Sequence, residues 1–104
     1  AIRTLKLDEA VGEPIDKFKI KYSDIDINRH VNTLNYITWM VNCFSPDEHT
    51  SNIIKRFDVN FMNEILYNDS VEVFKEQLNA NEYRFEIKSN SSTACRGKIT
   101  FESI

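Results

Sequence analysis

The residues with the clearest potential for chemistry lie in one short polar segment, residues 24–32 (DIDINRHVN). Asp26, Asn28 and His30 are spaced two apart, so an extended backbone would place their side chains on one side. They would then lie just ahead of a helix, whose N-terminus offers free N–H groups and positive partial charge to an anionic intermediate. This pattern suits acyl transfer to water, with the helix terminus as oxyanion hole and His30 or a carboxylate transferring protons.

A purely structural explanation of the segment is stronger on spacing alone, because a D-x-N-x-H string in a loop is a weak signal. Asp24 and Asn28 would form Asx turns, and Asn32 would cap the helix. The apolar residues of an extended segment would point to its other side: Ile25, Ile27 and, nearly, Val31.

A metal site or a serine nucleophile has less support. Asp26 and His30 could bind a cation, but a third and a fourth ligand are not evident. His49 lies in a separate polar turn, where we expect it on the surface. Ser23 lacks the glycine-flanked elbow that surrounds a nucleophilic serine. We therefore expect no metal site.

The composition is that of a small acidic domain. The 104 residues, 41% of them hydrophobic, suffice for one core, and the net charge of −3 argues against a broad nucleic-acid surface. Only two glycines are present, which excludes a dinucleotide fingerprint or phosphate loop, and we expect no cofactor. No apolar run approaches the roughly 20 residues of a membrane span, and no signal peptide is evident. Cys43 and Cys95 are expected to be free buried thiols in a reducing cytosol, so we expect a cytoplasmic protein.

The elements that must position the polar segment are a strand before it and a helix after it. Apolar side chains alternate with lysines over residues 17–22, which predicts a strand with one wet face. Residues 33–44 (TLNYITWMVNCF) are apolar over most of a helical circumference, so this helix should be buried on most sides. Residues 46–52 are expected to form a connecting loop or short turn.

The remainder of the chain predicts strands over residues 57–62, 71–79, 83–89 and 94–103. The turns between them are short, so consecutive strands are expected to be antiparallel neighbours. One strand, one apolar helix and further strands predict an α+β fold, with an antiparallel sheet of about five strands wrapped around one central apolar helix.

Two stretches resemble acyl-acyl-carrier-protein thioesterases. Residues 22–39 (YSDIDINRHVNTLNYITW) resemble the family's D-x-N-x-H-V-N-N and Y-I-x-W stretches, which open the central helix of a hot-dog domain. Residues 60–64 (NFMNE) and 67–71 (YNDSV) resemble its later strand-and-turn motif with an acidic residue. The resemblance extends from about Lys17 onward, although the last two strands match in pattern only. It implies a hot-dog fold.

The resemblance implies that Asp26, Asn28, His30 and Glu64 form the catalytic set. Glu64 would activate water or attack the thioester carbonyl. Asn28 and His30 would position the water and the carbonyl, and Asp26 would orient a neighbour by hydrogen bonding. Without the resemblance, Glu64 would be read as an exposed carboxylate at a strand end.

Departures from the family pattern are informative at two positions. Some plant members have a cysteine directly after this glutamate, whereas this chain has Ile65, which disfavours a thiol-dependent mechanism. In the turn before the aspartate, Asn68 replaces the usual glycine. Asparagine tolerates a left-handed backbone nearly as well as glycine, so we expect the turn to be retained.

The implied activity is hydrolysis of acyl-acyl-carrier-protein thioesters to free fatty acid, which terminates fatty-acid biosynthesis. The alternatives are an acyl-coenzyme A thioesterase of the same fold and a non-catalytic acyl-binding or dimerisation module. A dehydratase is disfavoured because Val31 and Asn32, and not proline and glycine, follow His30. The expected partner is acyl carrier protein, whose acidic surface could dock on the lysines of residues 17–21 or on Lys55–Arg56. Lysines that protect a solvated edge strand explain the same residues.

The resemblance also concerns domain organisation. A hot-dog unit normally pairs with a second one, either in the same chain or across a dimer. Residues 1–16 lack sustained periodicity and are expected to be a linker or approach segment. Residues 17–104 are expected to form a hot-dog thioesterase domain. We expect this domain to be the C-terminal, catalytic half of a double hot-dog protein.

Overall fold

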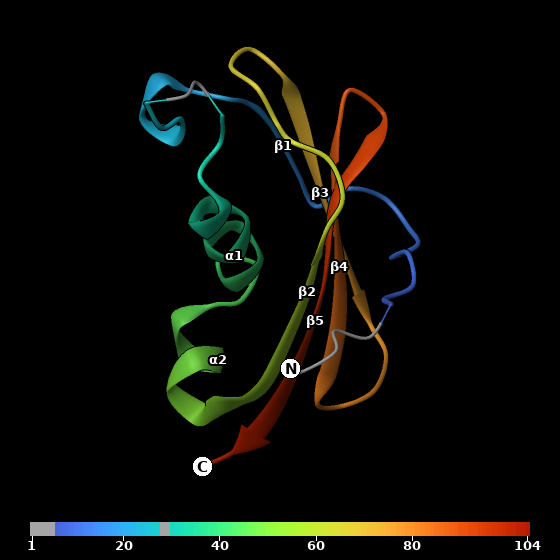
Figure 1. The fold of residues 1–104 in the computed structure, drawn as a ribbon. Helices are drawn as coiled ribbons and strands as arrows, with labels where there is room; N and C mark the ends of the chain where they lie inside the picture. Colours follow the sequence, from blue (N-terminus) through green and yellow to red (C-terminus); the bar gives the residue numbers. More distant parts are fainter. Residues whose placement is uncertain (1–5, 28–29) are drawn as a thin grey trace, which may run out of the picture.

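The computed structural model describes residues 6–27 and 30–104. It contains a five-stranded antiparallel sheet with helices on one face (Figure 1). This is the α+β architecture that the sequence predicts. The elements are β1 (Asp16–Lys19), a 3₁₀ helix (Tyr22–Asp24), α1 (Thr33–Val41), α2 (Pro46–Ser51), β2 (Asn52–Phe61), β3 (Ser70–Gln77), β4 (Glu82–Ser89) and β5 (Ser92–Ser103). No helix among the described residues is long and apolar enough to cross a membrane.

The strands lie in the order β1-β3-β4-β5-β2. The β3–β4 and β4–β5 pairs are antiparallel neighbours, as predicted. β2 and β3 are not neighbours, because β2 pairs with β5 at one edge and β1 pairs with β3 at the other. Residues 62–69 carry the chain between them, with Asn68 at a φ of 73°, the left-handed conformation expected of it. Turn residues alone do not distinguish a hairpin from such a crossing.

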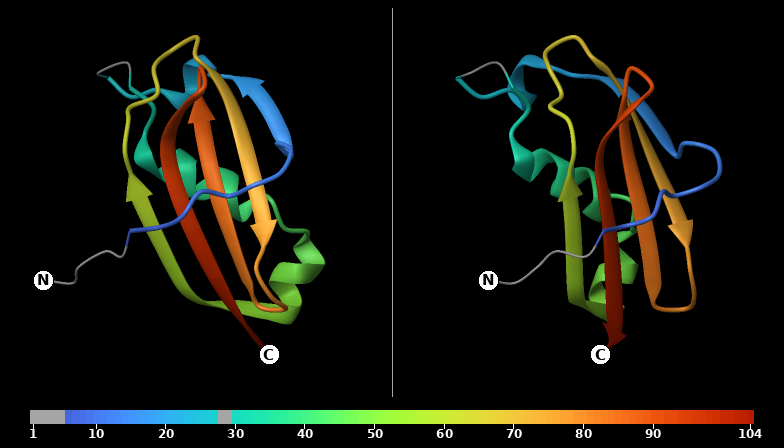
Figure 2. Two further views of the ribbon diagram at one scale, coloured as in Figure 1. Left: turned by 90° about the vertical axis from the view of Figure 1, so that its right-hand side faces the viewer. Right: turned by 45° about the vertical axis from the view of Figure 1, so that its right-hand side comes forward.

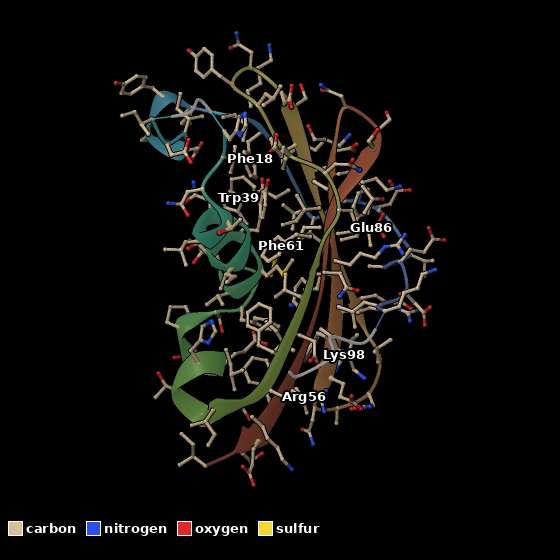
Figure 3. All side chains as sticks on the ribbon, viewed as in Figure 1. Phe18, Trp39, Arg56, Phe61, Glu86 and Lys98 are labelled. Carbon is tan, nitrogen blue, oxygen red and sulfur yellow. The ribbon has the colours of Figure 1, made fainter. Side chains whose placement is uncertain are left out.

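The core lies between α1 and the sheet. Met40 of α1 is fully buried and lies against Gly97 of β5, where a Cβ atom would clash with the methionine sulfur. Glycine at this position therefore leaves room for the end of the flexible Met40 side chain against β5. Phe18 and Trp39, which are partly buried, and Phe61, which is half-exposed, lie on the side of the sheet that faces α1 (Figure 3). The Phe18 and Trp39 rings meet edge to face, with centroids 5.0 Å apart.

Two predictions about the helical region are wrong. Residues 46–51 form the helix α2, because Pro46 occupies its first turn and Ser45 and Glu48 form a capping box. The apolar circumference of α1 is covered on one face only: Tyr36 and Met40 are buried, whereas Leu34 is exposed. The sheet lies against one side of the helix, and no other described element covers the opposite side (Figure 1).

The predicted strand over residues 17–22 is shorter than expected. It ends at Lys19, and residues 22–24 form the 3₁₀ helix, closed by the Asp24 carboxylate, which accepts a hydrogen bond from the Lys21 N–H (2.9 Å). Tyr22 is consequently exposed. Alternation of apolar and charged residues continues past the last residue that pairs with β3, so the sequence pattern does not mark this strand end.

Residues 6–15 cross the sheet on the face away from the helices (Figure 2). Backbone N–H groups along this lead segment donate to the sheet: Leu7 to Asn60 Oδ1 (2.7 Å), Ala10 to Glu86 Oε1 (3.2 Å), Val11 to Glu76 Oε1 (3.0 Å) and Ile15 to Val73 O (2.8 Å). The described part of the expected linker is therefore bound to β2, β3 and β4. One consequence is that Glu86, on the polar side of β4, is fully buried.

Both cysteines are free thiols, as predicted, and Cys95 is buried as expected, whereas Cys43 is only partly buried. Burial raises the pKa of Cys43 to about 11 and that of Cys95 to about 12, because the interior disfavours the thiolate. The prediction for His49 is wrong. Its Nε2 lies 2.8 Å from the Val41 carbonyl oxygen, and its ring packs against Phe44 within the fold.

Candidate active site

A pocket of about 400 Å³ opens between the start of α1 and the end of β2. It brings together three of the four residues that the sequence singled out, and the fourth, Asn28, lies outside the described residues. Its walls combine polar and apolar side chains. The lining residues are Asp26, His30, Val31, Asn32, Thr33, Tyr36, Phe61, Met62, Asn63 and Glu64.

The loop before α1 is closed on itself and is not extended. Ile25 and Val31 form an antiparallel bridge. Inside it, the Asp26 N–H donates to the His30 carbonyl oxygen (2.9 Å), and the His30 N–H donates to Asp26 Oδ1 (3.3 Å). The expectation of an extended segment with Ile25, Ile27 and Val31 on one side is wrong, because Ile27 lies in a turn and is 97% exposed, whereas Val31 is buried. Asp26 and His30 therefore meet across the base of a loop.

The structural role expected of Asn32 is confirmed. Its side-chain oxygen accepts a hydrogen bond from the Leu34 N–H (2.9 Å), and its carbonyl oxygen accepts one from the Asn35 N–H (2.9 Å). Asn32 thus satisfies donors of the first helical turn and also lines the pocket. The helix terminus faces the site with Thr33 at its first position.

His30 and Glu64 come from distant parts of the chain, and their side chains are in contact. His30 Nδ1 lies 3.4 Å from Glu64 Oε1, and the side chains are 42% and 71% exposed. The backbone creates this meeting, because His30 and Leu66 form an antiparallel bridge and the Val31 N–H donates to the Ile65 carbonyl oxygen (2.9 Å). The loop after β2 is therefore joined to the loop before α1.

Tyr36 is a pocket residue that the sequence did not single out. It is placed there by α1, one helical turn from Asn32, and it contacts Phe61 at a ring-centroid distance of 5.7 Å. Burial raises the pKa of its phenol. A usable signal was present: tyrosine within a buried stripe brings a hydroxyl group that needs a partner.

The arrangement combines an accessible carboxylate, an imidazole and an apolar wall formed by Tyr36, Phe61 and Met62. Such a site can activate water next to an apolar chain. Residues 6–27 and 30–104 contain no group of three or more His, Cys, Asp or Glu side chains placed to hold a metal ion.

Comparison with solved structures identifies the fold as a hot-dog. An acyl-ACP thioesterase from Bacteroides thetaiotaomicron is 30% identical, with a TM-score of 0.91 over 98% of this chain and 42% of that one. The 12:0-ACP thioesterase from Umbellularia californica is 17% identical, with a TM-score of 0.82 over 100% of this chain and 40% of that one. A thioesterase from Thermus thermophilus, complexed with coenzyme A and Zn, is 18% identical, with a TM-score of 0.67 over 86% and 77% of the two chains.

This chain therefore spans about two fifths of the length of each of the two acyl-ACP thioesterases. No curated protein sequence matches it significantly. At the level of sequence families, residues 8–103 match the acyl-ACP thioesterase C-terminal domain. The match covers nearly the whole chain, including both stretches that resemble the family and the four expected site residues. The chain belongs to the acyl-ACP thioesterase family, as a C-terminal domain with the hot-dog fold.

Proposed function

We propose that this chain supplies the catalytic residues of a thioesterase that releases fatty acids from acyl carrier protein. The observation that carries the proposal is the contact between His30 Nδ1 and Glu64 Oε1, 3.4 Å apart, in a pocket with an apolar wall. Family membership supports the same activity. The thioester carbonyl would lie at the polar end of the pocket, and the acyl chain would follow Phe61 and Met62.

Glu64 is the group proposed to act on the thioester. As a general base, its carboxylate would take a proton from water while the water oxygen adds to the carbonyl carbon. The tetrahedral intermediate would then break its C–S bond, and the departing thiolate would take up a proton. As a nucleophile, Glu64 would instead form a mixed anhydride that water hydrolyses. Label in Glu64 after a single turnover in ¹⁸O-water would establish the anhydride route with water attack at the glutamyl carbon. Trapping with hydroxylamine would detect an anhydride that water attacks at the acyl carbon, which puts the label in the fatty acid, as direct water attack does.

Asp26 and His30 are proposed to hold the substrate and water in place. The Asp26 N–H donates to the His30 carbonyl oxygen, and the Asp26 carboxylate accepts from the His30 N–H. These two hydrogen bonds hold the His30 backbone and thereby position its imidazole. The imidazole would donate to the thioester carbonyl or to the attacking water. Asn28 is proposed to assist in this positioning, as the family resemblance implies.

The test of this function is hydrolysis by the complete enzyme. Glu64→Gln and His30→Ala are each expected to lower kcat/KM by about 100-fold or more, because each removes a group that acts in the transition state. Glu102→Gln is the matched control, since Glu102 is exposed on β5 and does not line the pocket. Wild-type rates in both site variants would contradict the proposal.

The substrate carrier is tested separately. We propose acyl carrier protein, and the same acyl group is offered on carrier protein and on coenzyme A. A higher kcat/KM for the carrier protein substrate supports the proposal, whereas a preference for coenzyme A would indicate an acyl-coenzyme A thioesterase. Reversing the exposed charges of Lys19 and Lys21 is expected to raise KM for the carrier-linked substrate alone, if that acidic protein docks beside β1. Activity on neither substrate would favour a non-catalytic module.

A second hot-dog domain is proposed as the structural partner. β2 is an edge strand, and apolar side chains are exposed along it, directly after it and on α1: Leu34, Ile53, Ile54, Phe61 and Met62. This chain covers only 42% and 40% of the two acyl-ACP thioesterases, which supports the presence of a further domain. Hydrogen exchange in the full-length protein is expected to show protected outer amides on β2, with the opposite edge β1 as internal control. Equally rapid exchange at both edges would contradict this pairing.

A further inference from the structure

One peptide unit joins the two loops of the site. It lies between Ile65 and Leu66, directly after Glu64, and its carbonyl oxygen accepts a hydrogen bond from the Val31 N–H (2.9 Å). Its N–H points the opposite way, because a trans peptide is planar, and it donates to Asp69 Oδ2 (2.9 Å). This peptide is therefore held from both ends, by the loop before α1 on one side and by Asp69 on the other.

Asp69 is itself attached to the turn between β4 and β5. Its Oδ2 accepts a second hydrogen bond from Ser89 Oγ (3.0 Å), and its Oδ1 accepts one from Asn90 Nδ2 (3.1 Å). Ser89 is buried, and the Asn90 side-chain oxygen accepts from the Ser70 N–H (3.1 Å), so both donors are held in place. The Asp69 carboxylate thus connects the end of the sheet to the peptide that follows Glu64.

The side-chain contact within the pocket is too weak to supply the alignment by itself. His30 Nδ1 and Glu64 Oε1 are 3.4 Å apart, and the two side chains are 42% and 71% exposed. A contact of this length and exposure contributes little energy. The relative placement of the two groups therefore depends on the backbone, where His30 and Leu66 form an antiparallel bridge.

We propose that Asp69 is a positioning residue of this site: it holds this peptide and thereby keeps the Glu64 carboxylate aligned with His30. The inference rests on the proposed thioesterase function. Asp69 does not line the pocket, so it acts through the backbone and not on the substrate. Small displacements of a reacting group cost large factors in rate, so losing this hold should slow the chemical step more than it weakens substrate binding.

The test is Asp69→Ala in the full-length enzyme. We expect kcat to fall by about 10-fold with KM nearly unchanged, because the residues that line the pocket are retained. Asp69→Asn should lose less, since its amide oxygen can still accept from the Leu66 N–H. Asn79→Ala is the matched control, because Asn79 Oδ1 accepts from the Asn81 N–H (2.9 Å) in the turn at the opposite end of β3. It breaks the same kind of hydrogen bond away from the pocket, and we expect wild-type kinetics.

Hydrogen exchange separates this role from local stabilisation of a turn. Without the Asp69 carboxylate, the Leu66 amide should exchange with solvent about 10-fold faster or more. The Val31 amide should also exchange faster, because its acceptor belongs to the same peptide. Asn79→Ala should change neither amide. The measurement needs no activity, so it tests the hold even if the wild-type protein hydrolyses no thioester, an outcome that would refute the proposed function.

A double variant connects the hold to Glu64. In a Glu64→Gln background, adding Asp69→Ala should cause no further loss of the residual rate, because the carboxylate to be aligned is already absent. The same loss with and without Glu64 would overturn the role of Asp69, as would an unchanged kcat or an unchanged Val31 exchange rate in Asp69→Ala. Should the alanine variant not fold, Asp69→Asn replaces it in every measurement, with smaller changes of the same sign expected.

Discussion

Glu64 and Glu86 are two carboxylates beside a basic side chain, and their surroundings are opposite. Glu86 lies on the sheet face away from the helices, with its side chain 1% exposed (Figure 3). Its Oε2 accepts from Thr93 Oγ1 (2.6 Å) and its Oε1 from the Ala10 N–H (3.2 Å), with Arg96 Nε 3.4 Å away. Glu64 lies at the pocket, where its half-open surroundings leave the carboxylate 71% exposed and in contact with His30.

The difference separates a structural carboxylate from one that is available for chemistry. A buried charge is tolerated where donors satisfy it, and Glu86 uses its oxygens to hold the lead segment on the sheet. Its lone pairs are already occupied. Glu64 retains lone pairs that can accept a proton from water or reach a carbonyl carbon. The chemical difference between the two residues thus arises from burial and from hydrogen bonding, since the residue type is the same.

The same substitution at both positions is expected to have opposite effects on activity and on stability. Glu64→Ala is expected to lower kcat/KM by about 100-fold or more while changing the free energy of unfolding by less than about 0.5 kcal/mol, since the side chain is exposed. Glu86→Ala is expected to lower the free energy of unfolding by about 3 kcal/mol. The change removes the carboxylate beside Arg96, whose charged side chain is largely buried. Activity assays and urea titration measure the two effects.

The comparison fails if both variants lose activity at full stability, or if both are destabilised alike. The rate of Glu86→Ala must be measured well below its melting temperature, where the folded fraction is complete. Under those conditions we expect near wild-type kcat, because Glu86 does not line the pocket.

Asp26 lies between the two extremes, being exposed but hydrogen-bonded to the backbone of His30. Asp26→Asn keeps an oxygen acceptor for the His30 N–H, whereas Asp26→Ala removes it. We expect kcat to fall by about 10-fold in the alanine variant and by less in the asparagine variant, because orientation needs the acceptor more than the charge. Steady-state kinetics of the two variants checks this order. A larger loss in Asp26→Asn would instead indicate that the charge itself acts in catalysis.

A smaller effect is expected at Thr93, which donates to Glu86 Oε2 (2.6 Å). Thr93→Val keeps the shape but removes the hydroxyl donor. We expect the free energy of unfolding to fall by about 1.5–2 kcal/mol, the lower part of the range for hydrogen bonds to charged groups, because Thr93 is only partly buried. Urea titration measures the change, and Thr100→Val, on the same strand, is the control. An unchanged stability would mean that Glu86 is sufficiently held by its other contacts.

The two thiols extend the comparison to groups that are neutral when buried. The raised pKa values, about 11 for Cys43 and about 12 for Cys95, mean that the folded protein resists deprotonation that the unfolded chain allows. The neutral thiols contribute fully to the free energy of unfolding below the unfolded-state pKa of roughly 8.5. This contribution declines as the pH rises toward the pKa values of the folded protein. We expect slow alkylation of both thiols in the native protein at pH 8 and rapid alkylation in urea. Rapid native labelling of Cys95 would contradict its burial.

Much of the fold could be predicted because local patterns repeat along the strands. Alternation located β3, β4 and β5, and short turns indicated their antiparallel pairing. The capping role of Asn32 and the left-handed Asn68 also follow from local chemistry. The helix α2 was missed because a proline followed by five polar residues carries no apolar periodicity, although Ser45 and Glu48 form a capping box that could have indicated it.

The sequence by itself determined which side chains could do chemistry, since residue type sets the charge and hydrogen-bonding groups of Asp26, His30 and Glu64. Only the tertiary structure decided which of them meet. The bridges of Ile25 with Val31 and of His30 with Leu66 join two loops distant along the chain. Likewise, only the crossing of residues 6–15 over the sheet buries Glu86. Burial and proximity depend on segments far away in the sequence, and spacing along one strand or loop carries no information about them.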